Sequence, residues 1–298
     1  LDMVKEAYRV SEEYTVPVML RMTTRVCHSK SLAVETARQE VKAKPYVKER
    51  DKMDAVPAIS KVRRYFVEER EQKLKAYAEV CPFNVEEMHD TKIGIIAAGA
   101  AYTYAKEALG DKASYLKLGF TYPLPIEKIK AFAAKVDTLY VVEELDPFME
   151  EIIHEAGIPC HGKDVIPKID ELNPNIVAAG ILNQKAEGVQ VPDTLFVPRP
   201  PALCAGCPHR GFFYELAKRK DTVMVGDIGC YALGGAAPLS AKDLAVCMGS
   251  AFAVSHGLCH GFAMSGQKKR VVGVMGDSTF FHTGINSLTE VSYNQSPS

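Results

Sequence analysis

Short apolar runs alternate with amphipathic stretches between residues 92 and 165, and this alternation predicts strands and helices in turn. The predicted strands are Ile93–Ala98, Ala113–Leu118 and Thr138–Val142. The helices predicted after them are Tyr102–Leu109, Ile126–Ala134 and Phe148–Ala156. Because strands that alternate with helices are typical of a parallel sheet, we predict an α/β unit in this region.

A second α/β pattern occupies the last third of the chain. Its predicted strands are Thr222–Val225 and Val271–Met275. Its predicted helices are Gly211–Arg219, Gly249–Met264 and Thr283–Asn294. The predicted fold class is therefore α/β, with parallel-sheet domains.

The first 80 residues show a weaker pattern. Val4–Tyr14 has helical spacing, Val16–Leu20 is an apolar run that predicts a strand, and Val62–Ala78 predicts an exposed amphipathic helix in a charged connecting segment. A strand needs neighbours in a sheet, and few candidates lie close to it in the sequence. We therefore expect the chain to be an internal fragment that begins inside a domain.

These patterns divide the chain into five segments. Residues 166–200 are rich in Pro and Asn, which is typical of a linker. The predicted segments are the end of one domain at 1–35, a helical connection at 36–91, the first α/β unit at 92–185, a linker at 186–201 and the second unit at 202–298.

The composition is that of an ordinary globular protein, with 47% hydrophobic and 24% charged residues and a net charge of -1. This balance provides no bulk attraction to nucleic acid or to an anionic membrane, so we expect neither as a partner. No apolar run reaches the roughly 18 residues of a membrane span, and no signal peptide is visible. The eight cysteines suit thiolates in a reducing cytoplasm better than disulfides.

Three of these cysteines lie at motif-like positions in the second unit. Cys204 and Cys207 form a Cys-x-x-Cys pair, whose turn can bring two sulfurs to one side, and Cys230 follows the predicted strand Thr222–Val225. We expect the three sulfurs to converge as an incomplete tetrahedral set. A fourth ligand would come from outside the chain or from Cys247, Cys259 or His209. A metal cluster, a structural zinc ion, a redox dithiol and three unliganded cysteines all remain open.

The predicted strand Val271–Met275 ends at the turn Gly276-Asp277-Ser278, just before a helix. A carboxylate in this position suits a hard cation that bridges to phosphate oxygens at the helix end. Met248-Gly249-Ser250 likewise begins a helix, whose free amides could face a phosphate, although the same small residues also suit close packing on a sheet.

Histidines supply further candidates for polar chemistry. His282 follows the Gly-Asp-Ser turn closely and is the candidate for a polar active-site group. His256 and His260 have the spacing of metal ligands, but no acidic ligand accompanies them, so packing or hydrogen-bonding roles are favoured.

Four motifs follow one another in the second unit, and together they resemble a known family. They are Cys204-Ala-Gly-Cys-Pro-His-Arg-Gly, Gly226-Asp-Ile-Gly-Cys-Tyr-Ala-Leu-Gly, Met248-Gly-Ser and Gly276-Asp-Ser-Thr-Phe-Phe-His-Thr-Gly. The chain resembles the large (alpha) subunit of indolepyruvate ferredoxin oxidoreductase, a thiamine-pyrophosphate-dependent 2-oxoacid:ferredoxin oxidoreductase. The resemblance covers the whole chain. The start resembles the end of a pyrimidine-binding domain, and residues 92–185, which include Glu143-Glu-Leu-Asp-Pro-Phe, resemble a transketolase C-terminal-like domain. Residues 202–298 resemble the first part of a diphosphate-binding domain.

The resemblance implies three cofactors: thiamine diphosphate, Mg²⁺ and a [4Fe-4S] cluster. The cofactor-binding residues it implies are Gly229, Tyr231, Met248, Gly249, Ser250, Gly276, Asp277 and Ser278. The metal ligands it implies are Asp277 for magnesium and Cys204, Cys207 and Cys230 for the cluster. The fourth cysteine, the second magnesium ligand and the glutamate that activates the cofactor would lie outside this chain.

The implied activity is the oxidative decarboxylation of an arylpyruvate such as indolepyruvate to an aryl-acyl-CoA. Ferredoxin would receive the electrons, coenzyme A the acyl group, and a small (beta) subunit would complete the enzyme. A non-oxidative thiamine-dependent 2-oxoacid decarboxylase and a zinc-stabilised interaction module are the alternatives. Metal analysis of anaerobically purified protein would separate the three. Iron with sulfide would indicate the oxidoreductase, zinc the interaction module, and no metal the decarboxylase. We expect this chain alone to be inactive.

Overall fold

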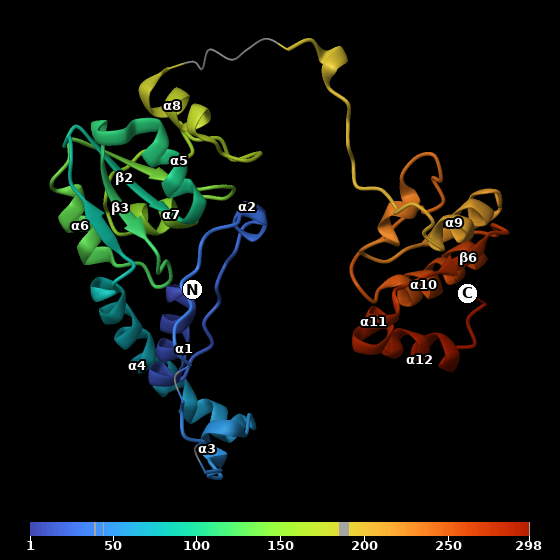
Figure 1. The fold of residues 1–298 in the computed structure, drawn as a ribbon. Coiled ribbons are helices and arrows are strands. Elements are labelled where there is room, and N and C mark those ends of the chain that lie inside the picture. Colours follow the sequence, from blue (N-terminus) through green and yellow to red (C-terminus); the bar gives the residue numbers. More distant parts are fainter. Residues whose placement is uncertain (39, 44, 185–190, 298) are drawn as a thin grey trace. The chain divides into compact units, whose positions relative to one another are not determined.

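The structure, a computed structural model, describes residues 1–38, 40–43, 45–184 and 191–297 (Figure 1). These residues group into two compact units, Leu1–Val189 and Gln190–Ser298. The predicted boundary between residues 185 and 186 lies outside the described residues. Both units contain parallel strands covered by helices, so the predicted α/β class is confirmed.

The first unit contains a four-stranded sheet with the order β1-β3-β2-β4. The central strand β2 runs parallel to β3 and β4, whereas β1 pairs antiparallel with β3 at the edge. The strands are β1 (Val85–Glu87), β2 (Ile93–Ala98), β3 (Ser114–Leu118) and β4 (Thr138–Val142). The sequence pattern predicted the parallel strands but missed β1. This strand forms because it pairs with β3, and its own residues carry no clear strand pattern.

Side chains of β2 alternate between two apolar cores, one on each face of this sheet. Ile95 is fully buried in one core and its neighbour Ile96 in the other. Residues of α5 and α8 contribute to the first core, and residues of α6 and α7 to the second (Figure 1). These helices are α5 (Gly99–Leu109), α6 (Ile126–Ala133), α7 (Phe148–Glu155) and α8 (Pro174–Leu182). Burial on both faces explains why the strand is continuously apolar.

Helix α8 lies within the Pro- and Asn-rich stretch 166–200, so the expectation of a linker throughout that stretch was wrong. The Oδ1 atom of Asn173 accepts a hydrogen bond from the backbone N–H of Ile176 at 3.0 Å, and Pro174 occupies the first helical turn. Both features are ordinary signals for a helix start. The buried Val177 and Ile181 then fix the helix against the core.

The N-terminal segment differs from its prediction in several elements. Residues 16–20 form no strand in the described part of the chain; instead Val16 and Val18 pack on a small core shared by α1 and α4. Helix α4 is also longer than predicted and is not solvated throughout, because Leu74 and Tyr77 are buried in that core. The helices of this segment are α1 (Asp2–Tyr14), α2 (Thr24–His28), α3 (Arg50–Met53) and α4 (Pro57–Val80).

The second unit is built around two parallel strands, β5 (Thr222–Val225) and β6 (Arg270–Gly273). Neighbouring β5 residues again enter opposite cores, with Met224 in one and Val225 in the other. The helices are α9 (His209–Ala217), α10 (Ala251–Met264), α11 (Asp277–Thr279) and α12 (Ile285–Tyr293) (Figure 1). A π-helical segment, Phe280–Gly284, joins α11 to α12. The last helical stretch therefore begins at Asp277 and not at Thr283 as predicted.

No helix in the described ranges is both long and apolar enough to span a membrane.

Candidate functional site

The sequence motifs of the second unit meet at the carboxyl ends of β5 and β6. These strands are parallel and in register, with Val225 opposite Gly273, so the segments that follow them leave from the same edge of the sheet. The backbone N–H of Val274 donates to the Val225 carbonyl at 3.0 Å and continues this pairing past the end of β6. The Gly226-Asp227 and Gly276-Asp277 segments are thereby brought side by side.

Asp227 joins three of the motif segments through one carboxylate. Its side chain is completely buried, with 0% exposure. Its Oδ1 atom accepts a hydrogen bond from the Gly249 N–H at 3.3 Å, and its Oδ2 atom accepts one from the Gly276 N–H at 3.1 Å. Asp227 belongs to a motif of the sequence, but the sequence pattern predicted no role for it. The available signal was an acidic residue directly after a buried strand.

Gly249 has a backbone conformation that favours glycine. Its φ is +87°, and a Cβ atom there would lie 2.7 Å from the Thr283 side chain. The Gly249 carbonyl accepts a hydrogen bond from Ser287 Oγ at 3.2 Å. Because both polar backbone groups of Gly249 are engaged within the protein, this residue shapes the turn and its amide is not free to bind a phosphate.

Ser250 completes the same turn and precedes α10. Its hydroxyl donates to the Cys247 carbonyl at 2.8 Å and accepts from the Cys247 N–H at 3.2 Å. The amides that remain without helical partners at the start of α10 are those of its first turn, as in any helix. Met248 stands beside them with 46% of its surface exposed.

Asp277 is the first residue of α11 and is exposed, as is Ser278. No side chain in the described parts of the chain forms a hydrogen bond or ion pair with the Asp277 carboxylate, Lys268 and Arg270 included. A carboxylate at a helix start that has no partner among the described side chains is available to a cation. Mg²⁺ commonly uses only one or two carboxylates and completes its shell with phosphate oxygens and water.

His282 lies in the π-helical segment and is exposed, with its Nδ1 atom in contact with Thr283 Oγ1. Such segments are frequent at functional sites, but they also arise from packing. Here Gly284 allows the close approach of Met275, because a Cβ atom would lie 2.2 Å from the Met275 sulfur. The geometry gives His282 no specific reacting partner.

Tyr231 connects the cysteine motif to the Gly-Asp-Ser turn. Its ring centroid lies 4.7 Å from that of His209, and its Cε2 atom would lie 3.9 Å from a Cβ atom placed on Gly276. The neighbouring Gly229 has a φ of +94°, which permits the sharp turn before Cys230.

The three motif cysteines are free thiols, as are the other five. The Cys207 N–H donates to the Cys204 carbonyl at 3.2 Å, and Arg210 Nε donates to the same carbonyl at 2.9 Å, so the Cys-x-x-Cys loop is closed. Among the described residues, however, no group of three or more His, Cys, Asp or Glu side chains is arranged to hold a metal ion. The geometry therefore does not support a cluster on Cys204, Cys207 and Cys230, and that assignment stays a prediction.

His256 and His260 face each other on α10, with ring centroids 4.5 Å apart. The His256 Nδ1 atom is buried and has no hydrogen-bond partner among the described residues. No acidic side chain joins the pair in a metal-binding group in that part of the chain.

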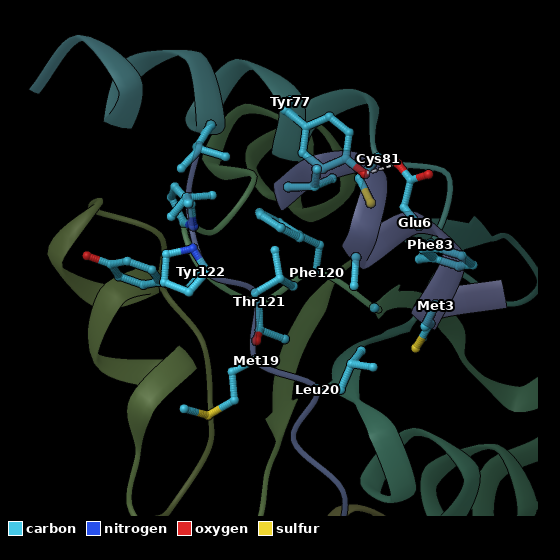
Figure 2. A pocket seen from close by; sticks show the side chains of 18 of the residues that line it. Met3, Glu6, Met19, Leu20, Tyr77, Cys81, Phe83, Phe120, Thr121 and Tyr122 are labelled. Carbon is cyan, nitrogen blue, oxygen red and sulfur yellow. Dashed lines mark hydrogen bonds between the residues drawn. The ribbon is translucent and has the colours of Figure 1, made fainter. Parts of the chain in front are cut away.

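A separate cavity of about 350 Å³ lies in the first unit, between α1, α4 and the loop at residues 119–123 (Figure 2). Figure 2 shows Tyr77, whose hydroxyl donates to Glu6 Oε1 at 2.5 Å, above Phe120. Burial raises the pKa of Tyr77, and a hydrogen bond from Arg9 is the main cause that lowers the pKa of Glu6, so the phenol donates and the carboxylate accepts. The walls are mostly apolar, and none of the cofactor-motif residues lines them.

The residues of the second unit fit thiamine diphosphate and magnesium. The fit rests on the donor set: an unpaired carboxylate at Asp277, placed by a strand end at the start of a helix, with a second helix start held beside it by Asp227. They supply one magnesium ligand, so the remaining ligands would be phosphate oxygens, water and other residues.

A known protein family matches the part of the chain that contains this candidate site. Residues 227–298 match the family described as thiamine pyrophosphate enzyme, C-terminal TPP binding domain, and the match begins at Asp227. Indolepyruvate oxidoreductase subunit IorA of Pyrococcus horikoshii is 33% identical over 99% of this chain and 52% of its own length. The IorA subunit of Methanothermobacter marburgensis is 35% identical over 99% of this chain and 51% of its own.

A solved structure is more distant. The 2-oxoglutarate:ferredoxin oxidoreductase from Magnetococcus marinus, with 2-oxoglutarate, coenzyme A and succinyl-CoA bound, covers 44% of this chain and 24% of its own at 14% identity and a TM-score of 0.34. That likeness is too weak to carry an argument. In sequence, the chain is similar over nearly its whole length to indolepyruvate oxidoreductase subunit IorA, and it spans about half the length of the curated subunits it matches.

Proposed function

We propose that this chain forms part of a thiamine-diphosphate-dependent 2-oxoacid:ferredoxin oxidoreductase that acts on arylpyruvates such as indolepyruvate. The carboxylate of Asp277, which begins α11 and has no side-chain partner among the described residues, carries the proposal. The relatives named indolepyruvate oxidoreductase and the matched TPP binding domain support it. The whole enzyme would transfer the acyl group to coenzyme A and electrons to ferredoxin, together with a small (beta) subunit.

Thiamine diphosphate, when bound, supplies the nucleophilic carbon that attacks the keto carbon of a 2-oxoacid. The residues of this chain would bind and orient it. Asp277 would ligate the magnesium ion, while Gly276 and Gly249 would shape the turns on either side. The exposed Met248 would supply apolar surface next to those turns. Positioning of this kind reduces the entropy cost of bringing two reactants together.

The organisation inherited from the resemblance remains part of the proposal. Residues 1–35 are the proposed end of the pyrimidine-binding domain, and residues 36–91 connect it to the next domain. Residues 92–185 are the proposed transketolase C-terminal-like domain. A linker at 186–201 then leads to the first part of the diphosphate-binding domain at 202–298. Cys204, Cys207 and Cys230 are the proposed ligands of an iron–sulfur cluster.

The role of Asp277 can be tested by calorimetric titration of thiamine diphosphate in the presence of Mg²⁺, with the complete subunit. Asp277→Ala should weaken magnesium-dependent binding about ten- to a hundredfold, because a charge-assisted contact contributes roughly 1.5–3 kcal/mol. Asp193→Ala is the matched control, since Asp193 is also exposed and also begins a helical turn of this unit.

The control variant should bind the cofactor as the unchanged protein does. Equal affinities for Asp277→Ala and the unchanged protein would remove Asp277 from the magnesium site. Absence of any thiamine diphosphate binding by the unchanged subunit would contradict the proposed function itself. Comparing turnover of indolepyruvate and 2-oxoglutarate with an artificial electron acceptor then tests the substrate class.

A further inference from the structure

The carboxylate of Asp227 is the most buried charged group at the carboxyl edge of β5 and β6. Its 0% exposure means that water does not solvate it, so its oxygen atoms must find hydrogen-bond donors within the protein. The two backbone N–H groups of Gly249 and Gly276 provide that stabilisation, one to each oxygen. A buried carboxylate that accepts amide hydrogen bonds on both oxygens has a defined orientation.

The two amides belong to turns that are far apart in sequence. Gly249 lies 22 residues after Asp227 and precedes α10, while Gly276 lies 49 residues after it and precedes α11. α10 has 14 residues, and α11 opens a continuous helical stretch that runs through Phe280–Gly284 to the end of α12 at Tyr293. Each turn therefore directly precedes a helix start whose free amides and positive dipole end favour an anion. The carboxylate of Asp227 therefore sets the separation between two helix starts.

Asp227 itself is not available to a ligand. Both of its oxygens point to protein amides, and a Cβ atom on Gly276 would lie 4.0 Å from its Oδ2 atom, so the residue is packed beneath the turn. Asp277, which begins the neighbouring helix, is exposed and unpaired among the described side chains. Asp227 thus holds the backbone of the two turns from inside the protein, whereas Asp277 is exposed and can act as a metal ligand.

We propose that Asp227 is a positioning residue for the diphosphate–magnesium site: it clamps the turns at Gly249 and Gly276 so that the starts of α10 and α11 bind one diphosphate together, with Asp277 on its magnesium ion. This inference rests on the proposed function. The exposed motif residues cannot hold the two turns together in this way, because in the described structure none of them contacts both turns through one side chain.

The decisive variant is Asp227→Asn in the complete subunit. Asparagine has nearly the same volume, but only one of its two terminal atoms accepts a hydrogen bond, and its NH₂ group would face the second backbone N–H. One of the two turns therefore loses its partner. We expect the dissociation constant for thiamine diphosphate at saturating Mg²⁺ to rise about ten- to a hundredfold, as when an outer-shell partner of a metal ligand is changed.

Asp243→Asn is the matched control. The Asp243 carboxylate also accepts a backbone N–H bond in this unit, from Met224 at 2.7 Å, but it contacts neither turn. Calorimetry separates the two kinds of effect. A residue that only maintains the fold changes the fraction of competent molecules and hence the stoichiometry, whereas a positioning residue changes the dissociation constant at unchanged stoichiometry.

Hydrogen exchange at the Gly249 and Gly276 amides gives a readout that needs no cofactor. Both should be protected in the unchanged chain, and at least one should exchange faster in Asp227→Asn, with no such change in Asp243→Asn. An unaltered dissociation constant in Asp227→Asn, or the same rise in both variants, would overturn the inference while leaving the proposed function intact. If the unchanged subunit binds no thiamine diphosphate, the proposed function fails, and the positioning role fails with it even if exchange confirms the clamp.

Discussion

At the scale of single residues, buried carboxylates hold the backbone where helices begin. Asp227 does so after β5, and Glu143 does so after β4, where its oxygens accept hydrogen bonds from the N–H groups of Met149, at 2.9 and 3.1 Å, and Glu150, at 2.9 Å. Glu143 is only 8% exposed. In both units an acidic side chain thus satisfies amides that the helix or turn itself cannot satisfy.

Glu143 makes stability depend on pH. Burial raises the pKa of its carboxyl group, despite the opposing hydrogen bonds from Met149 and Glu150. The folded state therefore holds this proton at a higher pH than the unfolded chain does, so the residue's contribution to stability rises as the pH falls through the raised pKa. Between neutral pH and the ordinary value of 4.5, the unchanged protein should gain stability relative to Glu143→Gln.

Urea unfolding of both proteins across that pH range measures the difference. A difference that is flat, or that falls on acidification, would show that the folded-state pKa is not raised. Glu143→Ala should cost about 1–3 kcal/mol at any pH in the range, because it leaves buried amides without an acceptor.

At the scale of elements, close packing decides whether a helical glycine can be replaced. Gly180 in α8 lies against the loop before it, and a Cβ atom there would lie 2.3 Å from the Val165 carbonyl oxygen. Gly257 in α10 has no heavy atom within 4 Å of its Cβ position. The two helices therefore use glycine for different reasons, and only α8 requires it for contact with its neighbour.

Alanine substitutions at these two positions should have opposite effects. Alanine is favoured over glycine in a helix by about 1 kcal/mol, so Gly257→Ala should raise stability by up to that amount. Gly180→Ala should instead lower it by roughly 1–3 kcal/mol, because the contact is with backbone and cannot be relieved by a side-chain rotation. Thermal unfolding of both variants gives the signs. A stabilised Gly180→Ala protein would mean that α8 does not pack this closely on residue 165.

At the scale of the whole molecule, the chain consists of two compact units, and the described residues that open the second unit are exposed. Residues 191–200 are all exposed, with 70% exposure for Leu195 and 65% for Phe196. In the first unit, Tyr46 reaches 90% exposure in a stretch that lacks strands among its described residues. Such segments are the preferred sites of proteolytic cleavage.

Limited chymotrypsin digestion should therefore cut first after Leu195 or Phe196 and near Tyr46. Phe132 and Phe213, which have 0% exposure, should resist cleavage. Replacing both Leu195 and Phe196 by serine should remove the first cut and leave the one near Tyr46 unchanged. Mass spectrometry of the early fragments identifies the sites. A first cut between residues 92 and 182 would contradict the compactness of the first unit.

Local patterns were enough to predict most of the elements and the place of the candidate site. The strands β2, β4 and β5 follow from apolar runs, and Gly276-Asp277 follows from its position between an apolar run and a helix. These features depend on residues that are close to one another along the chain, so the sequence is enough to predict them. The resemblance to indolepyruvate ferredoxin oxidoreductase also rests on the ordered motif series, which is a property of the sequence alone.

Only the tertiary structure decided the features that depend on distant partners. Residues 16–20 are apolar enough for a strand, but Val16 and Val18 pack on α1 and α4 instead, and β1 forms because β3 offers it an edge to pair with. The role of Asp227 is of the same kind, because its two amide partners come from separate turns that the parallel pairing of β5 and β6 brings together. A hydrogen bond across such a sequence distance leaves no periodic trace in the sequence, so it becomes visible only once the chain has folded.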